Sequence, residues 1–212
     1  KAGLLMETEP IINVARWLSR SSVNGPGDRF VLWVQGCPLH CPGCWNPATW
    51  SLSPRRIMGV SELVALIVGC QPIDGVTFTG GEPFAQAASL ALLAEQLLRQ
   101  NLSLMAFTGY EIEELTSAEQ VRLLACLDVL VTGRFVKELK TDGLLWRGSS
   151  NQRVHLLSDR HAGLELSGDV YPSSEVIITD NGTQIVSGFP ELGLLQRLDP
   201  MAAKRSCDKP SL

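Results

Sequence analysis

Three cysteines stand within eight residues of one another, at Cys37, Cys41 and Cys44. Thiolates at this spacing can ligate three irons of one [4Fe-4S] cubane, whereas an ordinary ferredoxin cluster takes four cysteines. The fourth iron then keeps an open coordination position, which suits a chelating ligand that carries an amino and a carboxylate group. The spacing therefore predicts an iron-sulfur cluster that binds a small molecule directly.

A structural zinc site is the alternative use of these thiolates, with His40 as the fourth ligand. His40 immediately precedes Cys41, and adjacent residues in a tight loop do not readily point at one metal. The scattered Cys70, Cys126 and Cys207 argue against a disulfide framework and favour metal binding in a reducing cytoplasm. Cys70 and Cys126 end or interrupt apolar helical patterns, where inert buried thiols are expected.

A glycine-rich segment at residues 80–83 is the second candidate for chemistry, and it follows the cysteines by about forty residues. Glycines let backbone carbonyls approach a ligand closely. Glu82 can support the segment or an ammonium group electrostatically. Alone, the segment would be an ordinary turn, but its place after a predicted strand makes it a candidate cradle for the ligand of the open iron.

Short apolar strands and helices alternate in the region that must position both segments. Strands are predicted at 30–35, 75–79, 102–108 and 129–132. Helices are predicted over 62–68, over 86–99 and from Ser117, where Ser117 and Gln120 fit a capping box. This alternation predicts an α/β fold with right-handed β/α units and a mainly parallel sheet, open or partly closed into a barrel.

One edge of this sheet is expected to gather the distinctive residues. Ligands of such sheets bind at the carboxyl ends of the strands. The cysteine loop and residues 80–83, 108–110 and 132–134 each follow directly after a predicted strand. These segments are therefore expected to surround a single site.

The C-terminal part of the chain has a different pattern. Asn181-Gly182 lies between two β-branched runs, which is a strong hairpin signal. We expect a core at 1–160, a β-hairpin extension at 161–198 and a mobile polar tail at 199–212. The hairpin is expected either to bind a partner or to cover an exposed flank of the barrel.

Composition excludes several classes of partner. The formal net charge of the 212 residues is -4 and the pI is about 5.4, so no basic surplus is present for nucleic acid or an anionic membrane. The apolar stretches are far shorter than the roughly 20 residues that span a bilayer. No secretory signal is visible, and a cytoplasmic location is expected.

The cysteine spacing and the glycine-rich segment together resemble the signature of the radical S-adenosylmethionine superfamily. More of the chain resembles the activating proteins of anaerobic ribonucleotide reductase, which are glycyl-radical activases. The resemblance covers roughly two thirds of the chain, in the segments 23–29, 41–50, 107–115, 129–140 and 146–155.

This resemblance implies a partial (β/α) barrel of the radical S-adenosylmethionine type with a C-terminal β-hairpin appendage. It implies an enzyme that uses a [4Fe-4S] cluster to cleave S-adenosylmethionine reductively and abstracts a hydrogen from a glycine of a large partner protein. Flavodoxin or ferredoxin would supply the electron. The cluster ligands would be Cys37, Cys41 and Cys44. The residues implied in cofactor binding are Trp45, Gly80, Gly81, Glu82, Pro83, Thr108, Arg134 and Arg147.

Several positions depart from the family pattern. Trp45 replaces a common Tyr, Thr132 stands where an Asp is expected, and Arg134 stands where a Lys is expected. Arg134 can still pair with a cofactor carboxylate. His155 and His161 have no visible ligand set and are expected to be surface or hydrogen-bonded histidines.

Two other functions remain open at the level of the sequence. One is a radical enzyme that modifies a ribosomally made peptide, and the other is a non-catalytic iron-sulfur or zinc module. The resemblance also implies that the loop at 23–29 lies on the same edge as the cysteines, near the partner glycine, while its composition indicates only a loop before the first strand.

Overall fold

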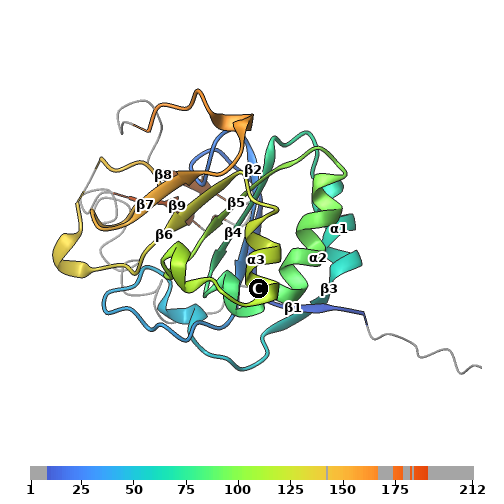
Figure 1. Cartoon of the computed structure of the whole chain (residues 1–212), viewed down its shortest axis with the longest axis horizontal. Helices are drawn as coiled ribbons and strands as arrows, with labels where there is room; N and C mark the ends of the chain where they lie inside the picture. Colours follow the sequence, from blue (N-terminus) through green and yellow to red (C-terminus); the bar gives the residue numbers. More distant parts are fainter. Residues whose placement is uncertain (1–8, 142, 167–173, 179–181, 183, 191–212) are drawn as a thin grey trace, which may run out of the picture.

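The computed structural model describes residues 9–141, 143–166, 174–178, 182 and 184–190, and Figure 1 shows its arrangement. A seven-stranded sheet has the order β3-β1-β2-β4-β5-β6-β7, and β8 and β9 form a separate two-stranded sheet. The strands are β1 Ile11–Ser21, β2 Arg29–Val34, β3 Arg56–Gly59, β4 Gly75–Gly80, β5 Ser103–Phe107, β6 Val129–Thr132, β7 Arg153–Leu156, β8 Ser174–Ile178 and β9 Gln184–Gly188. The α-helices are α1 Val60–Val68, α2 Ala87–Leu98 and α3 Ala118–Leu124. Short 3-10 turns are at Pro47–Thr49, Pro83–Gln86, Ile112–Glu114, Lys137–Leu139 and Asp159–His161.

The centre of the large sheet is parallel, as the alternation of strands and helices predicts. β2 pairs with β4, β4 with β5, and β5 with β6, all in parallel. The outer strands differ from the expectation, because β1, β3 and β7 add to this centre in antiparallel pairing. The fold is therefore an open α/β sheet with a parallel centre and antiparallel edges.

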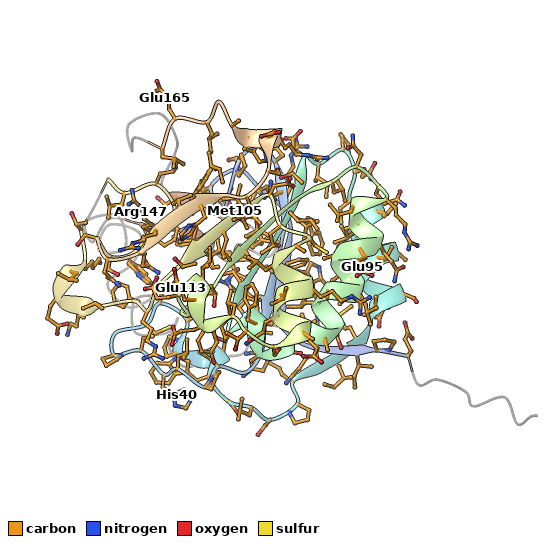
Figure 2. All side chains as sticks on the ribbon, viewed as in Figure 1. His40, Glu95, Met105, Glu113, Arg147 and Glu165 are labelled. Carbon is orange, nitrogen blue, oxygen red and sulfur yellow. The ribbon has the colours of Figure 1, made fainter. Side chains whose placement is uncertain are left out.

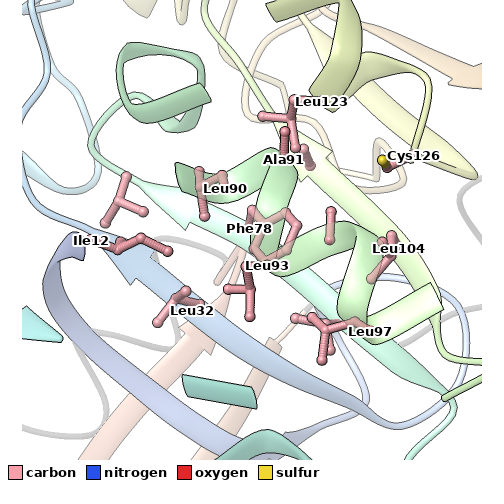
Figure 3. Packing of buried hydrophobic residues seen from close by; sticks show 14 of the residues in the cluster. Ile12, Leu32, Phe78, Leu90, Ala91, Leu93, Leu97, Leu104, Leu123 and Cys126 are labelled. Atoms are coloured by element: carbon pink, nitrogen blue, oxygen red, sulfur yellow. The ribbon is translucent and has the colours of Figure 1, made fainter. Parts of the chain in front are cut away.

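The three helices cover one face of this sheet and bury the larger apolar core. Phe78 of β4 packs among Leu90, Leu93 and Leu97 of α2, as Figure 3 shows. These four side chains are fully buried. At about 25 cal/mol per Å² of apolar surface, helix packing of this kind is the main contribution to the stability of the fold. α3 begins at Ser117, and the predicted capping box with Gln120 is confirmed.

A smaller apolar cluster lies on the opposite face, which we call the helix-free face of the sheet. Met105, Val129 and Val131 are its fully buried members from β5 and β6. Successive side chains of a strand point to opposite faces, so these residues alternate with Leu104, Ala106 and Leu130 of the helix-covered core. Half-buried apolar residues that pack against the cluster include Phe107, Val154, Leu156, Leu164, Leu166 and Phe189.

The predicted hairpin is present as β8 and β9, which pair in antiparallel fashion. Gly182 of the predicted turn is described and has a φ of +78°, a conformation that suits glycine. Asn181, Cys207 and the tail at 199–212 lie outside the described residues. Among the helices that the structure describes, none is long and apolar enough to cross a membrane.

Candidate functional site

The carboxyl ends of β2, β4, β5 and β6 form one edge of the sheet, which we call the rim. The cysteine loop leaves the rim at the end of β2 and folds back on itself. The Gly36 N–H donates to the Thr49 carbonyl at 2.8 Å, and the Cys37 N–H donates to the Trp50 carbonyl at 3.1 Å. Gly36 has a φ of +103°, which favours glycine at this turn. The two ends of the loop are therefore fixed to each other just where the first thiol begins.

The three predicted cluster ligands all lie in this loop. Cys37 is only 8% exposed, and Cys41 and Cys44 are half-buried. Burial raises the pKa of the Cys37 and Cys41 thiols, and backbone hydrogen bonds to the sulfurs act in the opposite direction. The Asn46 N–H also donates to the Cys44 sulfur at 3.3 Å. Hydrogen bonds to the sulfurs are one means by which proteins tune an iron-sulfur cluster.

The three thiols are a suitable set of ligands for an iron-sulfur cluster, because cysteine thiolates are the usual ligands of such clusters. All three are free, and all three lie in the single loop between β2 and the 3-10 turn at Pro47–Thr49. In the described ranges, no three His, Cys, Asp or Glu side chains already converge on one metal position. The ring of His40, the alternative zinc ligand, packs against Trp50 at 5.0 Å between centroids.

The glycine-rich segment lies beside the cysteine loop because the pairing of β2 and β4 continues past both strands. The Gly81 N–H donates to the Val34 carbonyl and the Glu82 N–H donates to the Gly36 carbonyl, both at 2.8 Å. A Cβ atom at Gly81 would lie 2.2 Å from the Gly36 oxygen. Glycine is therefore required at 81 because the backbone of the cysteine loop leaves no room for a Cβ atom. The sequence had suggested a bound ligand as the reason.

Glu82 joins this segment to the next loop of the rim. Its side chain is 1% exposed and accepts hydrogen bonds from the Phe84 N–H at 3.0 Å, the Thr108 hydroxyl at 2.8 Å and the Gly109 N–H at 2.9 Å. The Thr108 oxygen in turn accepts from the Tyr110 N–H. Burial raises the pKa of Glu82 to about 7, and the three donors oppose that rise. Glu82 therefore supports the segment, as one of its two expected roles.

Arg134 and Tyr110 lie on the rim after β6 and β5. The Arg134 guanidinium lies 3.8 Å from Glu114, and both side chains are about half exposed, so this ion pair contributes little stability. Burial raises the pKa of both Cys41 and Tyr110, and the nearby Arg134 charge opposes that rise. Arg134 is thus close to the cysteine loop and open to solvent, where it can meet an anionic group.

Residues 23–155 match a family described as a 4Fe-4S single cluster domain. The chain belongs to this family.

Relatives of known name agree with the family match. An anaerobic ribonucleoside-triphosphate reductase-activating protein of Salmonella typhimurium is 35% identical over 143 residues, which are 64% of this chain and 92% of that protein. The proteins of the same name from Escherichia coli and Vibrio cholerae are 36% and 38% identical over 143 residues, which are 92% and 90% of those proteins. The chain is therefore a radical S-adenosylmethionine activating enzyme with a [4Fe-4S] cluster, rather than a zinc module.

A solved structure, the crystal structure of QueE from Escherichia coli, is also similar. The match has a TM-score of 0.40 and 18% identity, and it covers 47% of this chain and 52% of that chain.

Trp45 and the segment after residue 140 approach each other beside the cysteine loop of this activating enzyme. The Lys140 ammonium lies 4.5 Å from the centroid of the Trp45 ring. A Cβ atom at Gly148 would lie 3.2 Å from the Trp45 ring nitrogen, which is buried and has no hydrogen-bond partner in the described structure. Arg147, labelled in Figure 2, donates at 3.4 Å to the Leu145 carbonyl within its own segment. Its contact with a cofactor stays a prediction.

The remaining histidines and Thr132 have structural partners. The Thr132 hydroxyl and the His155 ring share a hydrogen bond of 2.9 Å, and the Ser103 hydroxyl and the His161 ring share one of 2.8 Å. Both histidines are therefore hydrogen-bonded, which is one of the two states expected for them. Thr132 is fully buried and pairs with Arg153 of β7. Its side chain therefore does not present a group at the rim.

The loop at 23–29 lies away from the rim, contrary to what the resemblance implied. It precedes β2, and six extended residues, roughly 20 Å of strand, separate it from the cysteine loop. Asn24 accepts a hydrogen bond from Thr77 at 2.7 Å and is buried. The loop thus closes the amino ends of the strands.

Arg29 is a residue that sequence reasoning missed, because an arginine before an apolar strand carries no special signal. Its side chain is fully buried, and burial lowers its pKa to about 9. It donates to the Thr77 hydroxyl at 2.7 Å and to the carbonyls of Pro26, Val76 and Ser103 at 3.0, 2.7 and 2.9 Å. Arg29 therefore ties the 23–29 loop to β4 and β5 at the amino ends of the strands.

Proposed function

We propose that this chain activates an anaerobic ribonucleotide reductase-like enzyme by abstracting a hydrogen atom from a glycine of that protein. The observation that carries the proposal is the family match over residues 23–155, with the three cysteines and the glycine-rich segment at one rim. The residues that match this chain make up about nine tenths of the activating proteins of Salmonella typhimurium, Escherichia coli and Vibrio cholerae. The partner is accordingly a protein.

In this proposal Cys37, Cys41 and Cys44 hold the cluster. When bound, the cluster and S-adenosylmethionine supply a 5'-deoxyadenosyl radical. The backbone of residues 80–83 holds the amino group of the methionine moiety, and the buried Glu82 carboxylate fixes that backbone through its bond to Thr108. Gly80 and Pro83 contribute main-chain shape rather than side-chain chemistry, since glycine permits a φ of +105° and proline begins the following 3-10 turn.

Side chains at the edges of the site have more specific proposed roles. Arg134 pairs with the cofactor carboxylate, because its guanidinium is exposed beside Cys41 and can donate two parallel hydrogen bonds to a carboxylate. Trp45 offers an aromatic face to the adenine or to the cluster. Arg147 meets the ribose of the cofactor or the partner.

The electron donor in this proposal is a flavodoxin or ferredoxin, and the enzyme works in the cytoplasm. We further propose that residues 1–160 form the catalytic core, that 161–198 form the hairpin extension and that 199–212 form a tail. The family match, which ends at residue 155, supports this boundary.

The test is anaerobic reconstitution with iron and sulfide, followed by incubation with the large subunit of the anaerobic reductase from the same organism. A glycyl radical signal in electron paramagnetic resonance, with release of 5'-deoxyadenosine, is expected. Cys41→Ala is the control that should give neither product. Turnover of the cofactor only in the presence of a short precursor peptide, with no glycyl radical, would favour the alternative of a peptide-modifying enzyme.

A further inference from the structure

The β8–β9 hairpin lies on the helix-free face of the large sheet. Phe189, directly after β9, packs against the apolar cluster of that face, and Figure 1 shows β8 and β9 beside β6 and β7, away from α1 and α2. Within the hairpin, Glu175 pairs with Ser187 and Ile177 with Ile185, so these four side chains share one face. Ile178 belongs to the other face and is 69% exposed. The face that carries Ser187 is the one that contacts the core.

Two polar contacts fix the hairpin to the loop before β2. The Asn24 side-chain amide donates to the Ser187 hydroxyl at 2.7 Å, and the two residues are 5% and 3% exposed. The Ser22 N–H donates to the Glu175 carboxylate at 3.4 Å. A neutral hydrogen bond between two buried side chains from distant parts of the chain defines one docking position. The hairpin therefore has a specific place on the core.

Phe189, directly after β9, extends this contact toward the rim. Its ring lies 6.1 Å from that of Phe107 at an interplanar angle of 45°, a favourable arrangement for an aromatic pair. Phe107 is the last residue of β5, and the next residue, Thr108, donates to Glu82. Phe189 also packs against the cluster that contains Met105, as part of the helix-free face.

The hairpin lies beyond the part of the chain that the family shares. The family match ends at residue 155, and the hairpin begins at Ser174. The relatives match over 143 residues that make up about nine tenths of their own length. The cover over the helix-free face is thus an addition to the shared core, supplied by the same chain.

We propose that the hairpin is the floor of the cofactor site and that Phe189 is a positioning residue for the Thr108–Glu82 connection. By packing on Phe107, Phe189 holds the end of β5, and with it the hydroxyl that orients the glycine-rich segment. The hairpin closes the helix-free face, so a partner segment reaches the site from the rim. This inference rests on the proposed function, because it assigns the rim to the cofactor.

The experiment compares Phe189→Ala with Ile178→Ala in the full-length reconstituted protein. Ile178 lies on the same hairpin but on its exposed face, so it controls for changes to the hairpin itself. Iron content, binding of 1-anilinonaphthalene-8-sulfonate and affinity for S-adenosylmethionine are measured without any partner. For Phe189→Ala we expect unchanged iron, more dye binding, and a loss of affinity of about tenfold or less, the scale of one aromatic pair.

Wild-type dye binding and affinity in Phe189→Ala, or equal losses in Ile178→Ala, would overturn the proposal. If Phe189→Ala does not fold, Phe189→Leu decides the question, because leucine keeps an apolar side chain but loses the ring. It should bind dye like the wild type and S-adenosylmethionine more weakly, and wild-type affinity would overturn the positioning role. The glycyl radical assay is separate from these measurements, so failure here leaves the proposed function standing.

Discussion

The Thr108 hydroxyl donates a 2.8 Å hydrogen bond to the buried Glu82 carboxylate, and this bond connects the loops that follow β5 and β4. Glu82 is 1% exposed, so each of its donors replaces a water molecule that the carboxylate would have in solution. This carboxylate and its donors thus hold the β4 and β5 loops of the rim together.

Thr108→Val should lower the stability of the protein by about 1–3 kcal/mol, because it leaves a buried carboxylate oxygen with one donor fewer. It should also weaken S-adenosylmethionine binding. Urea unfolding and equilibrium binding measure the two effects. Thr108→Ser, which keeps the hydroxyl, is the matched control and should stay near the wild type. Equal behaviour of the valine and serine variants would show that the hydrogen bond has no such role.

Gly81→Ala should damage the cysteine loop as well as the cofactor segment. The added Cβ would meet the Gly36 oxygen at 2.2 Å, and a main-chain atom beside Cys37 cannot move without shifting the thiol. We expect a protein with less bound iron and a lower melting temperature. Gly163→Ala is the control, because a Cβ there meets no atom within 4 Å. Full iron content in Gly81→Ala would contradict this reading of the contact.

Substitution of any one of Cys37, Cys41 and Cys44 by Ala should abolish cluster assembly, since each is expected to ligate one iron. Cys70→Ala and Cys126→Ala should keep it. The Cys70 and Cys126 thiols donate to the carbonyls of Leu66 and Arg122, four residues earlier in each case, and lie away from the loop. Iron and sulfide analysis of the five variants decides the point, and a full cluster in Cys41→Ala would refute the assignment.

Arg29→Met should destabilise the protein without touching the cluster loop directly. The change removes the donors to three buried carbonyls and two hydroxyls, at a cost of about 1–3 kcal/mol for each group left without a partner. Arg29→Lys should recover only part of the loss, since an ammonium group cannot reproduce the planar set of donors. Thermal unfolding of the two variants and the wild type gives the comparison.

His161 should make the protein sensitive to mild acid. Burial and the nearby Arg29 charge lower the pKa of His161 below its ordinary 6.5. A histidine with a lowered pKa stabilises the folded state fully above about pH 6.5, and this stability is lost as the pH falls through the lowered value. The urea concentration at the midpoint of unfolding should therefore decrease as the pH is lowered below 6.5 in the wild type. His161→Gln should make this decrease smaller. An unchanged acid dependence in the variant would exclude this source.

The parallel centre of the sheet follows from local sequence, because its four strands are short apolar runs that end at glycines or polar turns. β2, β4, β5 and β6 lie within one or two residues of the predicted strands. The edges could not be predicted in the same way. In β1 the buried Ile12 and Val14 are followed by Arg16 and Arg20, so its apolar signal is weak, and its long-range partners decide its structure.

The candidate site, like the fold, could be predicted only in part from the sequence. The cysteines and glycines were found because their chemistry fixes residue type and spacing. The contacts of Glu82 with Thr108 and of Phe107 with Phe189 join segments far apart in the chain, so no local sequence pattern predicts them. Arg29 was missed for the same reason, since its acceptors are carbonyls of other segments.

The two hydrogen bonds that carry the β2–β4 pairing past Val34 and Gly80 limit where this enzyme can gain or lose residues. An insertion between Val34 and Cys37, or between Gly80 and Glu82, would shift one backbone against the other and break the bonds from Gly81 and Glu82. An insertion beside Gly143, where an added Cβ would meet no atom within 4 Å, only lengthens a connecting loop. Natural variation in length among activating enzymes should therefore fall outside these two short stretches, because one added or lost residue there would break the backbone pairing.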